Sequence, residues 1–164
     1  MTKLTARPPA MLDKYHGLEF SPLYSTSVKV TGTIAAPDAA SCIAQSEDGK
    51  LDVELRLPSV LGGPGGTTPE QLFAAGFAAC FYDTLKLLGN AYGLRVDDAA
   101  VDVAVTFGRD PVDGLYALQS KVSVQLPSVP SPTAEELIRN AERVCPYAKM
   151  TRQGIDCVIS LVRA

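Results

Sequence analysis

One apolar segment, residues 67–88 (TTPEQLFAAGFAACFYDTLKLL), restricts the possible folds of this chain. It opens with a helix start signal: Thr68 suits the N-cap, a proline follows at the first helical position, and Gln71 completes a capping box. A Gly-Asn pair at residues 89–90 supplies a stop signal. Because apolar side chains fall on nearly every face, we expect a central helix. Its many small residues would let another helix, or a second copy of the chain, approach closely.

Alternation of apolar and polar residues predicts strands on both sides of this helix. The expected strands cover residues 23–34, 51–57, 101–107, 116–126 and 155–161. Residues 35–48, small and polar, indicate a long turn. A second capping box, Thr133 to Glu136, predicts a helix that ends at about Cys145, since Pro146 follows at once. The order of strands, helix, strands, helix and strand predicts an α+β fold with largely antiparallel pairing.

The length and composition indicate one domain with a real hydrophobic core. The chain has 164 residues, of which 46% are hydrophobic and 20% charged, within the range of ordinary globular proteins. We expect an N-terminal extension over residues 1–21 and a single domain over residues 22–164.

Several partner classes are not expected. A net charge of -3 without a basic stripe gives no reason to expect nucleic-acid binding. Asp83 and Lys86 interrupt the longest apolar run, so we expect no membrane span. One histidine and no CxxC spacing argue against a metal site. Four cysteines are too few for a disulfide scaffold, and we expect a cytoplasmic, reducing compartment.

Two of the cysteines have very different settings. Cys80 lies deep in the apolar helix, whereas Cys145 closes the second helix. One sheltered thiol and one at a helix end suit peroxide reduction, in which the first attacks the O–O bond and the second resolves the sulfenic acid as a disulfide. The alternative is that both are structural, because a free cysteine usually behaves as a small buried hydrophobe.

Two long motifs carry a family resemblance. Residues 68–81 (TPEQLFAAGFAACF) closely resemble the first cysteine motif of the organic hydroperoxide resistance (Ohr) branch of the OsmC/Ohr superfamily. Residues 144–147 (VCPY), followed by Thr-Arg at 151–152 and Gly-Ile-Asp at 154–156, resemble its second motif. The stretch 48–53 (DGKLDV) is similar too.

The resemblance implies a fold and an activity. The fold would be an intertwined α+β homodimer, with largely antiparallel sheets wrapped around central helices and two sites at the interface. The activity would be that of an organic hydroperoxide reductase, a thiol peroxidase without metal or organic cofactor, reduced by a dithiol, typically a lipoylated protein. By motif match, Cys80 would be the peroxidatic thiol, Cys145 the resolving thiol and Glu70 the active-site carboxylate.

Glu70 and Cys80 are too far apart to share a site along one straight helix. Ten residues of α-helix rise about 15 Å. Either the helix bends near Gly76, or Glu70 of one subunit serves Cys80 of the other.

The sequence departs from the family at its catalytic arginine, which lies in the loop after the first strand. The corresponding residues 31–49 contain no Arg, Lys or His. Another base would have to substitute, and the candidates are Arg152, Arg56, Lys14 and His16. Otherwise the chain is a slow or specialised peroxidase, or it has kept the fold and lost the reaction. In that last case it would be a non-catalytic homodimer that binds a small hydrophobic ligand or senses redox state.

The remaining two cysteines have simpler expected roles. Cys42 falls in the expected turn and is interpreted as an incidental surface residue, with an extra resolving or sensing role as the alternative. Cys157 shares the apolar face of the last expected strand and is predicted to pack in the core.

Overall fold

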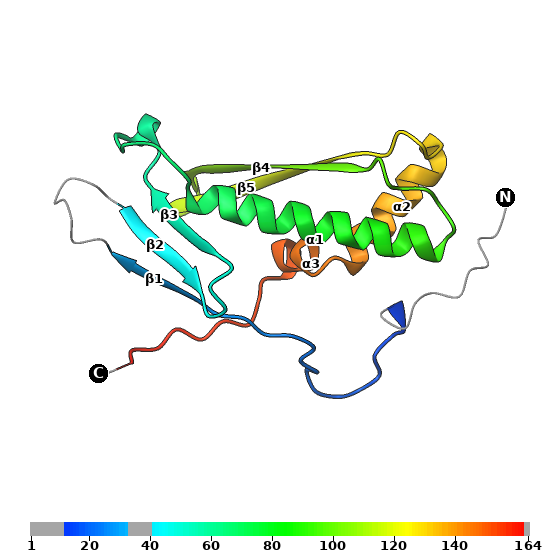
Figure 1. Ribbon diagram of the computed structural model, residues 1–164, viewed down its shortest axis with the longest axis horizontal. Helices are drawn as coiled ribbons and strands as arrows, with labels where there is room; N and C mark the ends of the chain where they lie inside the picture. Colours follow the sequence, from blue (N-terminus) through cyan, green and yellow to red (C-terminus); the bar gives the residue numbers. More distant parts are fainter. Residues whose placement is uncertain (1–11, 33–40, 163–164) are drawn as a thin grey trace. The chain divides into compact units, whose positions relative to one another are not determined.

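The computed structural model describes residues 12–32 and 41–162 and confirms an α+β fold (Figure 1). In chain order the elements are β1 (Val28–Gly32), β2 (Ser41–Ser46), β3 (Asp52–Arg56), a 3-10 turn (Ser59–Leu61), α1 (Pro69–Ala91), β4 (Ala100–Arg109), β5 (Tyr116–Gln125), α2 (Ser131–Val144) and α3 (Pro146–Gln153). Two compact units form. Of the described residues, the sheet unit comprises 14–32, 41–74 and 105–119, and the helical unit comprises 12–13, 75–104 and 120–162.

The sheet unit contains a three-stranded sheet in the order β1-β2-β3, with both pairs antiparallel. Ala44 of β2 and Leu55 of β3 are its buried apolar residues. Of the long turn predicted over residues 35–48, residues 35–40 lie outside the described residues. The prediction was wrong for residues 41–46, which form the middle strand of this sheet. Cys42 therefore lies half-buried in a strand rather than in a surface loop, paired with Gly32 and Leu55.

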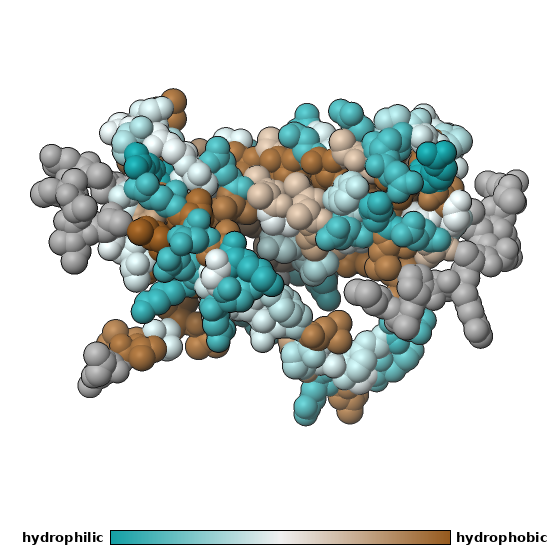
Figure 2. Space-filling view, viewed as in Figure 1, coloured by the Kyte–Doolittle hydropathy of each residue, from teal (hydrophilic) through white to brown (hydrophobic). Residues whose placement is uncertain are grey.

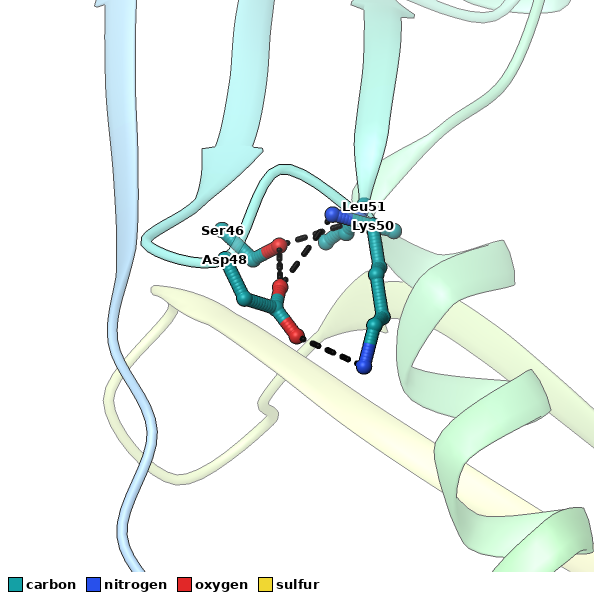
Figure 3. A network of polar contacts seen from close by, with 4 residues as sticks. All are labelled: Ser46, Asp48, Lys50 and Leu51. Carbon is teal, nitrogen blue, oxygen red and sulfur yellow. Dashed lines mark hydrogen bonds and ion pairs between the residues drawn. The ribbon is translucent and has the colours of Figure 1, made fainter.

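A tight turn joins β2 to β3 (Figure 3). The Ser46 hydroxyl donates to Asp48 Oδ1 at 2.6 Å, and the same oxygen accepts the Lys50 N–H at 3.1 Å. The Leu51 N–H donates to Ser46 Oγ at 2.9 Å. Gly49 adopts φ 70°, which a residue with a Cβ rarely takes. This network fixes the register with which β3 returns along β2.

Four of the five predicted strands are confirmed as strands, although β1 is shorter than expected. β4 and β5 form a two-stranded hairpin, closed by the Asp110 N–H, which donates to the Leu115 carbonyl at 2.8 Å. The fifth prediction was wrong. Residues 154–162 form no strand and are exposed throughout, so Cys157 is exposed rather than packed in a core.

α1 confirms the predicted helix and its capping box. The Thr68 N–H donates to Gln71 Oε1 at 3.0 Å, and the Gln71 N–H donates to Thr68 Oγ1 at 3.3 Å. Within the helical unit one stripe of the helix is buried: Phe77, Phe81, Thr84, Leu85 and Leu88. Ala75 and Ala79 are exposed, so the chain itself covers only part of this largely apolar helix. By length and composition alone α1 is also long and apolar enough to cross a membrane, a test that buried core helices pass as well.

α2 begins two residues before the predicted start, and a further helix follows it. Pro130 is the N-cap of α2 and no side chain caps it, so the expected capping box at Thr133 was wrong. The second proline, Pro132, suits the first turn of a helix, where its missing N–H has no intrahelical partner to lose. α3 was not predicted, because Pro146 was interpreted only as a stop signal.

Candidate functional site

The two cysteines of the motifs meet in the helical unit. Cys145 Sγ lies 3.5 Å from Cys80 Sγ, within hydrogen-bonding distance, although 65 residues separate the two in sequence. Both are free thiols in this structure. A disulfide needs an S–S distance of about 2.0 Å, so the sulfurs would have to approach by roughly 1.5 Å. A small displacement of the two sulfurs would therefore allow a disulfide bond to form between them.

Pro146 explains the position of Cys145. A residue before proline is driven out of the helical region, and Cys145 has φ -63° and ψ 119°. Cys145 therefore ends α2 and at the same time caps the start of α3. Its N–H still donates to Ala141 at 2.8 Å, and its carbonyl accepts the Lys149 N–H at 3.0 Å. Cys145 therefore lies at the corner between two helices, with both of its backbone groups hydrogen-bonded.

Tyr147 packs the start of α3 against α1. Its ring stacks on Phe77, with 5.9 Å between centroids and 29° between planes. Its hydroxyl lies over Gly76, where a Cβ would come within 3.0 Å. Gly76 therefore has a packing reason to lack a side chain, namely the close approach of this tyrosine.

The Cys80 thiol is strongly biased toward its protonated form. Its pKa is raised to about 11, first by burial and second by the hydrogen bond shared with Cys145, with a smaller contribution from the Asp83 charge. The backbone N–H of Tyr147, in the first turn of α3, donates to the sulfur and acts in the opposite direction on this pKa. Among the described residues no arginine or lysine contributes to the shift. At pH 7 a thiol with this pKa is a thiolate in only roughly one molecule in ten thousand.

The proposed substitute bases are engaged elsewhere or exposed. Arg152 Nη1 lies 2.6 Å from Glu142 Oε1, and its Nη2 donates to the Glu142 carbonyl at 3.0 Å. In the sheet unit, Arg56 Nη2 lies 2.9 Å from Glu54 Oε2. Lys14 and His16 are exposed. Much of the loop in which the family has its arginine, residues 33–40, lies outside the described residues.

Glu70 lies in the first turn of α1, half-buried. α1 continues through Gly76 without interruption, so ten residues of regular helix separate Glu70 from Cys80, a rise of about 15 Å. Both alternatives, a bend of α1 near Gly76 and a Glu70 that serves Cys80 of a second subunit, stay predictions.

The other chemistry-bearing side chains do not join the pair. Cys42 belongs to the sheet unit, and Cys157 lies in the exposed residues after α3. Within residues 12–32 and 41–162, no group of three or more His, Cys, Asp or Glu side chains could hold a metal ion. Sequence reasoning missed the role of the Tyr147 N–H. The signal was the proline at position 146, which starts a new helix whose first N–H groups have no intrahelical partner.

Comparison with known proteins places the chain in a family. Residues 62–160 match the model of the OsmC-like protein family. The chain is 36% identical over 121 residues to an organic hydroperoxide resistance protein of Xanthomonas axonopodis pv. citri, an alignment that covers 72% of this chain and 84% of that protein.

Solved structures agree with the sequence comparison. An organic hydroperoxide resistance protein from Legionella pneumophila superposes with a TM-score of 0.71 at 32% identity, covering 83% of this chain and 95% of that one. The organic hydroperoxide resistance protein OhrB of Bacillus subtilis superposes with a TM-score of 0.69 at 32% identity, covering 82% and 96%. By family model, sequence and fold, this chain belongs to the OsmC/Ohr family.

Proposed function

We propose that this protein reduces organic hydroperoxides to alcohols with the Cys80–Cys145 thiol pair. The observation that carries the proposal is the 3.5 Å between the two sulfurs, on a half-buried and a fully buried cysteine. The names of its relatives, organic hydroperoxide resistance proteins, support peroxide detoxification as the general role.

The proposed reaction has two steps. The Cys80 thiolate attacks the terminal peroxide oxygen, the O–O bond breaks, and the alkoxide leaves with a proton as an alcohol. Cys80 is left as a sulfenic acid. The Cys145 thiolate then attacks Cys80 Sγ, which releases water and forms the disulfide. A dithiol, in the family typically that of a lipoylated protein, restores both thiols, which suits a reducing compartment such as the cytoplasm.

We further propose that the working form is a homodimer. The single chain exposes many large apolar side chains, including those of residues 154–162 next to the grey C-terminal end (Figure 2). Both β1 valines, Val28 and Val30, and the α1 residues Ala75 and Ala79 are exposed as well. An apolar surface of this kind usually marks an interface. A second copy would also allow its Glu70 to approach Cys80 and hold a cation there.

The raised pKa of Cys80 favours a second candidate. Without a cation, a thiol with a pKa of about 11 is a poor nucleophile at neutral pH. A non-catalytic homodimer that binds a small hydrophobic ligand would need no such activation, and it predicts slow oxidation or none. A redox sensor would lie between the two candidates, because it would oxidise readily but turn over poorly.

Stopped-flow oxidation by cumene hydroperoxide separates the candidates. The reduced protein is compared with Cys80→Ser, Cys145→Ser and the control Cys157→Ser, which changes an exposed thiol outside the pair. For the peroxidase we expect rapid oxidation in the parent and the control, loss in Cys80→Ser by at least about a hundredfold, and a trappable sulfenic acid in Cys145→Ser. A parent that oxidises no faster than a free small thiol would reject the peroxidase in favour of the binding module.

A further inference from the structure

We infer that the reductant opens the Cys80–Cys145 disulfide by attacking Cys80 and never Cys145. The inference rests on the proposed function for the existence of the disulfide, and on the burial of the two sulfurs for the choice between them. The Cys80 sulfur would then react with both the peroxide and the reductant.

The chain's own helices shut Cys145 off from solvent. Its relative exposure is 0%, and Ala141 of α2 and Ala148 of α3 beside it are 0% and 4% exposed. The burial is already complete within one chain, so it does not depend on a second subunit. An incoming thiol would have to separate α3 from α1, against the stacking of Tyr147 on Phe77.

Cys80 is the more accessible partner. It is half-buried in the single chain, whereas Cys145 is completely buried, and it lies in the middle of α1. Joining the sulfurs requires a movement of roughly 1.5 Å, from 3.5 Å to bonding distance. Cys145 lies at the corner before Pro146, between two helices, and only a small movement is needed. In the disulfide, as in the free thiols, the Cys145 sulfur should therefore be buried and the Cys80 sulfur accessible.

Leaving-group chemistry does not oppose this choice. Attack on Cys145 would expel Cys80, whose pKa is raised to about 11 although the Tyr147 N–H donates to its sulfur. A thiol of higher pKa leaves more slowly in thiol–disulfide exchange. Exclusion of the nucleophile from a sulfur with no exposed surface acts in the same direction, because it lowers the rate by the fraction of time that the helices are apart.

The dithiol reduces the protein disulfide in two thiol–disulfide exchanges. A thiolate of the dithiol attacks Cys80 Sγ, the Sγ–Sγ bond breaks, and its electron pair leaves on Cys145, which takes up a proton. The mixed disulfide now joins Cys80 to the reductant. The second thiolate of the dithiol attacks the reductant's own sulfur, expels Cys80 and closes the reductant's disulfide.

The first test measures thiol access without any peroxide. In a Cys42→Ser/Cys157→Ser background, adding Cys145→Ser leaves only Cys80, and adding Cys80→Ser leaves only Cys145. We expect the aromatic disulfide reagent DTNB to modify native Cys80 at least about a hundredfold faster than native Cys145, and both at similar rates in urea. Equal native rates in folded proteins would overturn the inference.

The second test identifies the attacked sulfur in the intact pair. The double-serine background is oxidised by diamide, treated briefly with glutathione, quenched in acid and mapped by mass spectrometry. We expect glutathione on Cys80 and a free Cys145. Glutathione on Cys145, equal labelling of both, or failure of diamide to join the pair would each overturn the inference. Because neither test uses a peroxide, a protein that passes both but does not reduce peroxides would reject only the proposed function.

Discussion

Two cysteine-bearing regions on either side of α3 contrast sharply. Before α3, Cys145 is completely buried by its own chain and lies 3.5 Å from its partner sulfur. After α3, residues 154–162 carry Cys157 among apolar side chains that are all exposed, Ile159 at 93%. Both regions have apolar patterns in the sequence, but only the first finds its packing partner within one chain. The thiol pair is a property of the subunit, whereas the apolar side chains of residues 154–162 are not covered by the described residues.

The contrast predicts that the C-terminal residues hold two subunits together. Changing Ile159→Asp should raise the dimer dissociation constant about a thousandfold, since each copy loses about 2 kcal/mol of side-chain burial and the dimer contains two copies. Sedimentation equilibrium measures the constant. The matched control is Val112→Asp, an equally exposed valine (90%) in the turn between β4 and β5. A variant that associates as tightly as the parent would show that the C-terminal residues are not the interface.

A monomeric variant makes the comparison sharper, because the pKa of its Cys80 thiol has no contribution from a second subunit. In Ile159→Asp with Cys42→Ser and Cys157→Ser, iodoacetamide alkylation of Cys80 should rise about tenfold per pH unit above pH 7 and level off near pH 11. A chain that keeps only Cys157 reports how the reagent itself responds to pH. If a partner subunit supplies the cation, the dimer should level off at a lower pH. Levelling near pH 7 in the monomer would contradict the raised pKa.

The same raised pKa has a consequence for stability. Because the folded-state pKa of about 11 exceeds the ordinary value of 9.0, the folded state binds the Cys80 proton more tightly than the unfolded state does. This contribution is fully present below about pH 9 and is lost as the pH rises through 11. The urea midpoint of the monomeric variant should therefore fall over that interval, and less so in its Cys80→Ser derivative.

The sequence predicted several parts of the fold that local signals determine, although the capping box expected at Thr133 was wrong. The capping box of α1, the β4–β5 hairpin and the end of α2 before Pro146 all depend on neighbouring residues, and all are confirmed. The contact of Cys80 with Cys145 lies beyond local signals. The different settings of the two cysteines suggested a redox pair, with two structural thiols as the alternative, and the family resemblance favoured the pair. β2 was missed because its strand is short and follows a polar, proline-containing stretch, so pairing with both neighbours decides its conformation. The last strand was wrongly predicted, since an alternating pattern forms a strand only where a partner is available.

The pairing of Arg152 with Glu142, invisible to local signals, gives a smaller test. It joins the end of α3 to the last turn of α2 and so braces the corner that carries Cys145. Arg152→Met should slow disulfide formation several-fold with little effect on sulfenic acid formation at Cys80, and should cost roughly 0.5–1 kcal/mol of stability for a largely exposed pair. Arg152→Lys should restore part of the rate. A matched control, Arg139→Met, removes an exposed i,i+4 pair with Glu135 within α2. Equal slowing of both chemical steps would mean that Arg152 acts on the thiolate itself.

The smallest expected effect lies in the turn between β2 and β3, far in sequence from Cys80 and Cys145. The hydrogen bond from the Ser46 hydroxyl, and then that from the Lys50 N–H, hold the pKa of Asp48 below its usual value. A lowered folded-state pKa stabilises the fold above the ordinary value of 3.8, and the contribution is lost as the pH falls through the folded-state value. Asp48→Asn should therefore lower the urea midpoint slightly at pH 7 and not at pH 2. Lys50→Ala, which removes only an exposed ion pair of 3.5 Å, should leave it unchanged at both. Because the hydrogen bonds of this turn form within one chain, each variant should change the urea midpoint by the same amount in the dimer and in the Ile159→Asp background. A difference between those backgrounds would show that the interface includes the sheet unit.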